Sequence, residues 1–369
     1  MYKITIKLSE LRDVVTRGRM FAGKSKAMPV LDNVCITTKG ERIRIESNDC
    51  ENYVRSYGLC ESTSEVSFCV NANELSSYIS LLDDEYITME YDCQKRNLII
   101  THNNGKIKLP TTNAEEFPRT NPIKSDSKIV FPGKVLAGWL ATAGDFAMKS
   151  DLGGKLECVH IYANQEYIGV CGGDHHHIFD ARIKNTFNAP EFSILIPKTS
   201  AMAISRVCAS FDDVTIMQDD DAILVRTENT IIYSKLMCGK YPDVSRLFSQ
   251  KGSCCVKVDK TALLNAVKRI GSQTMQDDSA IHLRCTGSSF ELLYDVTAEY
   301  DKFLSENILC EGDCLDDAIV NVRLLRNILD KFNGDRVVLY YDRIEGRPFL
   351  FENTQEKISE QFLLATMIK

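Results

Sequence analysis

Residues 320–366 read VNVRLLRNILDKFNGDRVVLYYDRIEGRPFLFENTQEKISEQFLLAT, and the same order of patterns occurs at 69–118 and 196–242. Each segment opens with a short apolar strand, continues into an amphipathic helix that ends in Asp or Gly, and enters a second strand. The second strands begin at Ile87, Val214 and Val337, which are 127 and 123 residues apart, against 123 for one third of the 369-residue chain. Such a repeat indicates the architecture more firmly than any single motif.

The first half of each copy also repeats. An alternating strand leads into a helix three times: Tyr2–Lys7 into Ser9–Met20, Lys128–Phe131 into Gly133–Phe146, and Cys255–Val258 into Asp259–Ile270. Ser9 and Asp259 are good N-cap residue types. A unit of about 120 residues is large enough to enclose its own core. The sequence therefore predicts three consecutive domains of one fold, at residues 1–121, 122–249 and 250–369.

The boundaries and the fold class follow from local composition. Turn-rich stretches at Pro118–Ser127 and Pro242–Ser253 close one copy and open the next. Both linkers are short, which favours a nearly fixed relation between neighbouring domains. Strands outnumber helices, and many alternate with period two, as in Lys95–Thr101. This pattern predicts α+β domains, with antiparallel strands backed by two helices on one side.

Composition narrows the class of protein. The chain is 44% hydrophobic and 26% charged, which is typical of a soluble globular protein. It has no apolar run long enough to span a membrane, and its alternating N-terminus lacks the apolar block of a signal peptide. Fourteen cysteines lack the CxxC pairs of a zinc site. We expect reduced thiols in a cytoplasmic protein that needs no cofactor.

Charge is unevenly distributed along the chain. The formal net charge of −7 argues against nucleic-acid binding, because a basic domain is the usual footprint. The predicted helices are nevertheless rich in cations: Arg12, Arg17, Arg19, Lys134, Lys149, Lys198, Arg206, Lys260, Lys268, Arg269, Arg323, Arg326 and Lys331. Much of the acid lies in loops, as in Asp219–Asp221 and Glu311–Asp317. Two interpretations stay open: ordinary solvated helix faces, or one surface that meets a polyanion.

Local motifs then match a known family along the whole chain. They are Met28–Asn33 after the first helix, Leu109–Thr111 and Glu116–Pro118 at the end of the first copy, and Ser234–Leu236 with Gly239–Asp243 at the end of the second. With the triplication, these segments resemble the bacterial beta sliding clamps, the beta subunits of DNA polymerase III. None of them is a catalytic motif, so the resemblance implies a protein that is not an enzyme.

The resemblance implies a head-to-tail homodimer closed into a ring. Each chain would supply three tandem sliding-clamp domains, with antiparallel sheets outside and two helices per domain facing a central hole. The ring would encircle double-stranded DNA without reading its sequence and confer processivity on the replicative polymerase. Implied partners are the DNA polymerase III alpha subunit, the clamp loader and other proteins with a clamp-binding motif.

Two sets of site residues are implied by the resemblance. The DNA-contacting set is Lys24, Ser25, Lys26, Arg12, Arg17, Lys149, Lys198, Arg206, Lys268 and Arg323. The set for a pocket that captures an apolar client peptide is Leu156, Gly172, His175, His176, His177, Pro242, Arg246, Leu247, Asn321, Leu324, Ile344, Leu363, Ala365, Thr366 and Met367.

This chain also departs from the family pattern. Asn73 and Glu74 replace a basic pair in the first copy. Gly172–His177 replaces a Thr-Asp-Gly-His-Arg-Leu run, and Ala365–Lys369 replaces a Met-Pro-Met-Arg-Leu tail. We therefore expect a peptide pocket with an altered preference. These breaks also suit a second clamp copy, or one carried by a mobile element or phage.

Two other functions compete with a sliding clamp. Asp174–His177, with His160 or Asp180, offers ligands for a metal-dependent hydrolase, although consecutive histidines on a strand point to alternate faces. The negative net charge also suits a protein-interaction scaffold that no longer loads on DNA. For ring closure, the candidate segments are Asn71–Leu82 with Lys106–Leu109 on one side, and Ile270–Gln276 with Tyr294–Glu299 on the other.

Overall fold

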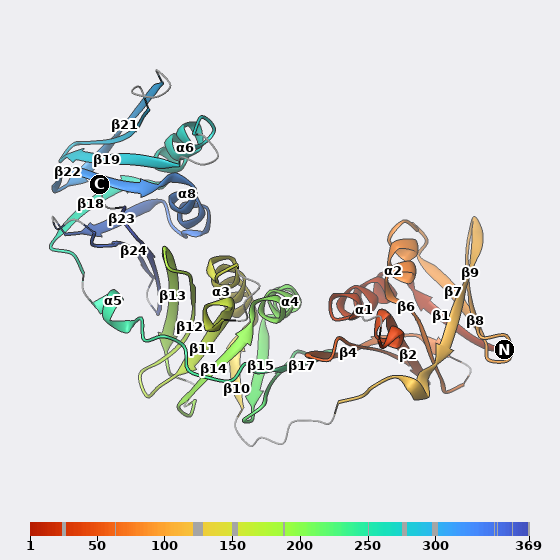
Figure 1. Ribbon diagram of the computed structural model, residues 1–369. Coiled ribbons are helices and arrows are strands. Elements are labelled where there is room, and N and C mark those ends of the chain that lie inside the picture. Colours follow the sequence, from red (N-terminus) through yellow and green to blue (C-terminus); the bar gives the residue numbers. More distant parts are fainter. Residues whose placement is uncertain are drawn as a thin grey trace. The chain divides into compact units, whose positions relative to one another are not determined.

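Figure 1 shows the computed structural model of the chain. It describes residues 1–23, 27–62, 64–120, 128–149, 154–186, 189–249, 251–274, 279–296, 302–342, 344, 346–355 and 357–367. The chain forms two compact units, one of Met1–Gly138 with Thr199–Leu236 and the other of Trp139–Lys198 with Met237–Lys369. Each unit combines antiparallel strands with helices, which confirms the predicted α+β class.

The first unit is built on one 13-stranded sheet in the order β10-β15-β16-β17-β4-β3-β2-β6-β9-β8-β7-β1-β5. Its strands are β1 (Tyr2–Lys7), β2 (Asn33–Lys39), β3 (Arg42–Asn48), β4 (Asn52–Leu59), β5 (Glu61–Ser62), β6 (Val66–Asn71), β7 (Tyr86–Asp92), β8 (Asn97–His102), β9 (Gly105–Asn113), β10 (Ile129–Pro132), β15 (Asp213–Gln218), β16 (Ala222–Arg226) and β17 (Thr230–Lys235). Its helical segments are α1 (Leu8–Met20), η1 (Pro29–Asp32), α2 (Ala72–Ser80) and η2 (Ala114–Glu116). Strand β17 pairs with β4, so strands of the middle third continue the sheet of the first third.

The second unit is built on a 12-stranded sheet in the order β14-β11-β12-β13-β25-β24-β23-β18-β21-β20-β19-β22. Its strands are β11 (Cys158–Ala163), β12 (Tyr167–Gly173), β13 (His177–Lys184), β14 (Phe192–Pro197), β18 (Cys254–Asp259), β19 (Ala280–Thr286), β20 (Ser289–Asp295), β21 (Phe303–Gly312), β22 (Cys314–Asn321), β23 (Arg336–Tyr341), β24 (Phe349–Gln355) and β25 (Ile358–Leu364). Its helical segments are η3 (Lys155–Glu157), α5 (Ser245–Ser249), α6 (Lys260–Gly271) and α8 (Val322–Lys331), while α3 (Gly133–Phe146) and α4 (Lys198–Cys208) contribute residues to both units. Strand β13 pairs with β25, so the middle and last thirds also share a sheet.

The N-terminal ends of α6 and α1 show where the local sequence is sufficient to predict the start of a helix and where it is not. The Asp259 carboxylate accepts from the Ala262 N–H at 2.8 Å, so the predicted cap of α6 is confirmed. Ser9 is not an N-cap: α1 begins one residue earlier, after Lys7. The buried Leu8 donates its N–H to the Glu85 carbonyl at 2.9 Å, and this bond carries β1 directly into the helix.

Each of the outer copies buries one face of a helix pair. In the first copy, Leu11 and Val15 of α1 and Leu75 of α2 belong to the same buried core as the strands. In the last copy, Val267 of α6 and Leu325 of α8 are buried. Figure 1 shows these two helices side by side against their sheet. The opposite faces of the helices remain exposed, and in the last copy the candidate cations Lys268 and Arg323 lie there.

Two general features bear on the class of protein. Among the described residues, no helix is long and apolar enough to cross a membrane. All fourteen cysteines are free thiols, and most of them are buried.

Candidate nucleic-acid interface and docking surface

The exposed face of α6 and α8 holds a cluster of cations. Lys268 of α6 and Arg323 and Arg326 of α8 are all exposed. Asp330 lies 3.5 Å from the Lys268 ammonium and 3.4 Å from the Arg326 guanidinium, so one acid holds side chains of both helices together. Cations outnumber acids on this face, which suits contact with a phosphate backbone.

A second cationic group lies at the C-terminal end of α3. Lys198 donates to the Ala147 carbonyl at 3.0 Å, and Lys149 is exposed close by. Burial lowers the pKa of Lys198, and the charge of Lys149 lowers it further. A bound anion would relieve this repulsion between like charges.

Arg12 and Arg17 are engaged within the protein. Arg12 donates to the Ile79 and Leu82 carbonyls and so closes the C-terminal end of α2. The side chain of Arg17 is only 13% exposed and donates to Asn229 Oδ1 at 2.8 Å. These contacts give both residues a structural role, and we remove them from the phosphate-contacting set.

The first copy offers few cations to a ligand. On the exposed faces of α1 and α2, the acids Asp13 and Glu74 accompany a single exposed arginine, Arg19, which donates to Asn73 at 3.0 Å. Lys24, Ser25 and Lys26 lie outside the described residues. Arg206 on α4 is exposed.

An apolar surface lies where α5 crosses β13 and β25. Leu363 is buried in a cluster with Phe248, and Ile178 and Val244 pack against it half-exposed. A neighbouring cluster around Tyr241 also receives Ile178 and Val244, together with Leu156. Leu247 of α5 is 43% exposed. We call the set Leu156, Ile178, Val244, Leu247 and Leu363 the docking surface.

His177 is not on this surface, contrary to the prediction. Its ring stacks on Phe146 at a centroid distance of 4.4 Å, and its Nδ1 lies 2.8 Å from the Asp174 carboxylate. Asn327 of α8 donates to its Nε2 at 3.2 Å. Because neighbouring strand residues face opposite sides, Ile178 takes the place expected for His177. The turn that starts β13 determines this register, and single-sequence patterning did not reveal it.

The other predicted pocket residues divide among several places. His175, Pro242 and Arg246 are exposed, Leu324 is half-buried, and Asn321 accepts from the Arg323 N–H as the N-cap of α8. A Cβ on Gly172 would lie 2.2 Å from the Ala143 carbonyl, so this glycine permits β12 to approach α3.

The C-terminal residues form a rim beside a separate hollow. Ala365 donates its N–H to the His176 carbonyl at 2.7 Å. Ile344, Thr366 and Met367 line a hollow of about 290 Å³, and the Thr366 hydroxyl donates to the Arg347 carbonyl. Ile344 and Met367 are exposed apolar residues of this hollow, whereas Asp316, Asp317, Asp342 and Arg347 make much of its lining polar and charged.

The histidine run does not form a metal site. Among the described residues, no group of three His, Cys, Asp or Glu side chains is placed to hold a metal ion. The Asp174 carboxylate is occupied instead by hydrogen bonds from His176 and His177, which outweigh its burial and lower its pKa to about 2. His160 and Asp180 line a different hollow, of about 510 Å³, where burial lowers the pKa of His160 to about 4 and raises that of Asp180 to about 6.

Besides the strands at the ends of the two sheets, parts of β9 and β21 have one side without a partner among the described residues. From Lys106 to Pro110, β9 pairs only with β8, and from Phe303 to Leu309, β21 pairs only with β20. Phe303 is 59% and Leu309 is 87% exposed. Tyr294 lies in β20 between β19 and β21 and is fully buried, and residues 275–276 and 297–299 of the predicted ring-closure segments lie outside the described residues.

The whole chain is similar to several known proteins. Solved sliding clamps of Pseudomonas aeruginosa and Thermotoga maritima each superpose with a TM-score of 0.90 at 16% identity, covering 100% of both chains. The beta sliding clamp of Rickettsia bellii is 19% identical over 363 residues, 94% of either chain. That of Synechococcus elongatus is 23% identical over 320 residues, 83% of either chain.

The fold of the chain is that of solved sliding clamps. Residues 2–121 match the family model described as the N-terminal domain of the DNA polymerase III beta subunit. Over most of its length the chain is similar in sequence to beta sliding clamps, at low identity.

Proposed function

We propose that this protein is a DNA sliding clamp, a ring-shaped homodimer that keeps the replicative polymerase on duplex DNA. The observation that carries the proposal is the match to sliding clamps along the whole chain, in fold and in sequence. The protein acts in the bacterial cytoplasm, where the replicated DNA lies, and contributes retention on DNA instead of catalysis.

DNA contact comes from cations on the helices of the middle and last copies. The proposed set is Lys149, Lys198, Arg206, Lys268 and Arg323, with Lys24 and Lys26 added from the sequence. Such contacts act on phosphates, so they are independent of base sequence and weaken with salt. A ring that must slide needs only weak contacts, since topology retains it.

Client proteins dock through an apolar peptide. The docking surface offers half-exposed aliphatic side chains around the buried Leu363. Partly buried aliphatic pockets suit a leucine or phenylalanine side chain. The polymerase alpha subunit, the clamp loader and other motif-bearing proteins are the proposed clients.

The ring closes where β9 of one chain meets β21 of the next. Both strands have an unpaired side among the described residues, so pairing them would continue the sheet across the interface. Lys106 and Lys108 are exposed on β9. Glu306 on β21 is held by Arg269 at 2.6 and 2.7 Å, so the exposed Phe303 and Leu309 offer the contact from that side.

Loading onto circular DNA tests the function. The purified protein, a matching clamp loader and ATP are incubated with nicked circular DNA, and the DNA-bound fraction is isolated by gel filtration. We expect retention on circles and release when a restriction enzyme linearises them. A dimer that no loader places on circles would support the interaction scaffold, which the weakly basic first copy favours.

Leu247→Asp is expected to weaken binding of a client peptide by at least about tenfold, because it places a charge where an apolar side chain should be buried. Fluorescence anisotropy with a labelled C-terminal peptide of the host polymerase measures this. The control is Leu81→Asp, a leucine that is 85% exposed outside the docking surface. Equal affinity of wild type and Leu247→Asp would remove α5 from the client site.

A further inference from the structure

Two buried cysteines lie directly opposite each other on the sheet of the first unit. Cys35 of β2 pairs with Cys69 of β6 in the antiparallel register, and neither is exposed to solvent. Ala114 and Phe117 belong to the same buried cluster as both cysteines. We call residues 114–119, which lead from this cluster to Arg119, the strap.

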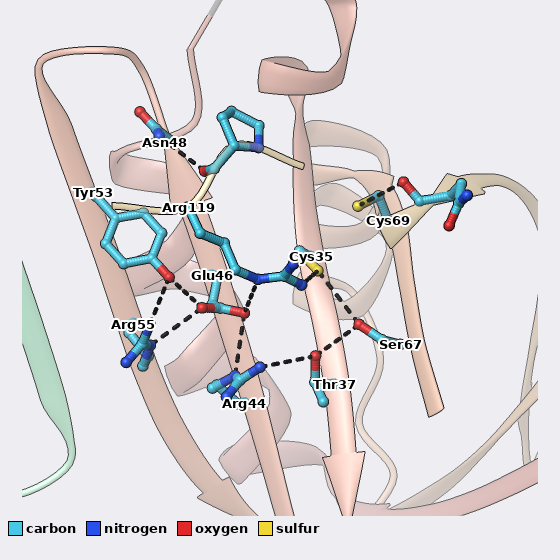
Figure 2. A network of polar contacts seen from close by, with 12 residues as sticks. Cys35, Thr37, Arg44, Glu46, Asn48, Tyr53, Arg55, Ser67, Cys69 and Arg119 are labelled. Carbon is cyan, nitrogen blue, oxygen red and sulfur yellow. Dashed lines mark hydrogen bonds and ion pairs between the residues drawn. The ribbon is translucent and has the colours of Figure 1, made fainter. Parts of the chain in front are cut away.

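Cys35 lies in a polar environment that favours a thiolate. Figure 2 shows the Arg119 guanidinium between Cys35 and the buried Glu46 carboxylate. Arg119 Nη2 lies 3.7 Å from the Cys35 sulfur, and the Ser67 hydroxyl lies at 3.7 Å on another side. Contact with Cys69 lowers the pKa of Cys35 and raises that of Cys69, and Ser67 and then Arg119 lower the pKa of Cys35 further, against burial and the Glu46 charge, which raise it. A nearby guanidinium is a recognised feature of reactive cysteines.

The backbone already meets the requirement for a disulfide. Residues directly opposite in an antiparallel pair have Cα atoms about 4.5 or 5.5 Å apart. A disulfide needs a Cα separation of about 4.4–6.8 Å. The two strands therefore need no shift in register to bring the sulfurs into bonding distance.

We propose that Cys35 and Cys69 form a peroxide-reactive dithiol that closes to a disulfide. The Cys35 thiolate attacks one oxygen of hydrogen peroxide, the O–O bond breaks, and the departing hydroxide takes a proton to become water. The Cys69 sulfur then attacks the resulting Cys35 sulfenic acid, an S–S bond forms, and a second water leaves with the Cys69 proton. Two thiols are oxidised by two electrons, and one peroxide is reduced to two waters.

A hollow lies beside the pair on the side of Cys69. Cys69 lines a hollow of about 710 Å³ whose walls include Val30, Asn33, Thr112 and Glu116. Peroxide is close to water in size, whereas a bulky disulfide reagent would need the strap to lift. Bulky reagents should therefore react more slowly with this pair than with the exposed Cys50 and Cys93.

A second cysteine pair provides an internal control. The sulfurs of Cys285 and Cys310 lie 3.5 Å apart and are also buried. Burial and the contact with Cys285 raise the pKa of Cys310 to about 12. The two sulfurs are therefore close together, but Cys310 is not activated as a thiolate. If activation decides reactivity, Cys35–Cys69 must close first.

Closure would act at a joint between two copies. Tyr53 of β4 belongs to the same buried cluster as the two cysteines, and Tyr233, opposite it on β17, packs against that cluster. Oxidation removes the Cys35 thiolate that Arg119 faces. We therefore expect altered amide hydrogen exchange in β4 and β17 of the oxidised protein.

Peroxide titration of the reduced full-length protein tests the proposal. Samples are quenched by alkylation, and disulfide-linked peptides are quantified by mass spectrometry. We expect the Cys35–Cys69 link to form before the Cys285–Cys310 link. Cys69→Ala should stop at a Cys35 sulfenic acid that dimedone traps.

Arg119→Met separates activation from proximity. It should slow formation of the link by about tenfold for each unit by which the thiol pKa rises. Arg42→Met, at an exposed arginine on the neighbouring strand β3, should leave the rate unchanged. Earlier closure of Cys285–Cys310, or an unreacted Cys35 when Cys50 and Cys93 are fully oxidised, would overturn the proposal.

Discussion

Glu46→Ala is expected to lower the free energy of unfolding of the first unit by about 3 kcal/mol. The Glu46 side chain is fully buried and accepts a hydrogen bond from the Tyr53 hydroxyl (Figure 2). Its two oxygens lie 3.2 Å from Arg44, 3.2 Å from Arg55 and 3.6 Å from Arg119. Removing the carboxylate leaves three arginines that repel one another on one face of the sheet.

The partial exposure of these arginines limits the expected loss. Their side chains are 33%, 30% and 41% exposed, so water can take over part of the lost interaction. A value near the lower end of the range for a broken buried ion pair is therefore the reasonable expectation.

Urea unfolding, monitored by amide hydrogen exchange in β3 and β4, measures the effect of Glu46→Ala in the first unit. Glu46→Gln keeps the shape and an acceptor for Tyr53, so its loss should be smaller. Glu41→Ala removes an exposed acid that directly precedes β3. It should change the free energy of unfolding by less than about 0.5 kcal/mol. Equal stability of Glu46→Ala and Glu41→Ala would mean that the cluster contributes no net stability.

Glu46 and its partners Arg44, Tyr53, Arg55 and Arg119 form the Glu46 cluster, which also holds the strap in place. Asn48 donates to the Pro118 carbonyl at 3.0 Å, next to the Arg119–Glu46 ion pair. Glu46→Ala should therefore make Cys35 and Cys69 more accessible, while the thiolate partner Arg119 loses its anchor. Stability and thiol reactivity are thus linked through one carboxylate.

The repeat could be predicted from the sequence because it depends on local patterns. Alternation predicts strands such as β1, and Asp259 predicts the start of α6, since both depend on residues close in the chain. The spacing between copies is counted along the sequence, so it can be found without knowing which residues are in contact. Fold class followed from these local signals alone.

The candidate sites were less readable because they depend on distant partners. Arg17 bonds to Asn229, far away in the chain, and this contact removes it from the exposed cations. His177 was predicted on the docking surface, but Ile178 lies there, because a one-residue change in register reverses the face of every side chain. The Glu46 cluster joins β3, β4 and the strap, and no sequence motif announces it.

The double substitution Phe303→Asp with Leu309→Asp is expected to weaken the proposed dimer by at least about a thousandfold. Two large apolar side chains at the centre of an interface contribute about 2 kcal/mol each, and every 1.4 kcal/mol changes the dissociation constant about tenfold. Both side chains are exposed in the single chain and lie on the same side of β21, next to its unpaired edge. Burying two carboxylates there adds a desolvation cost.

Sedimentation equilibrium measures the monomer–dimer constant, and retention on circular DNA measures the ring. Leu59→Asp is the matched control, because this leucine is 64% exposed on β4 away from either unpaired edge. The control should remain a dimer and stay on circles. If the double variant also stayed dimeric, the ring would have to close through other surfaces. If it became monomeric yet stayed on circles, retention would come from DNA affinity and should fall steeply with salt, which distinguishes binding from encirclement.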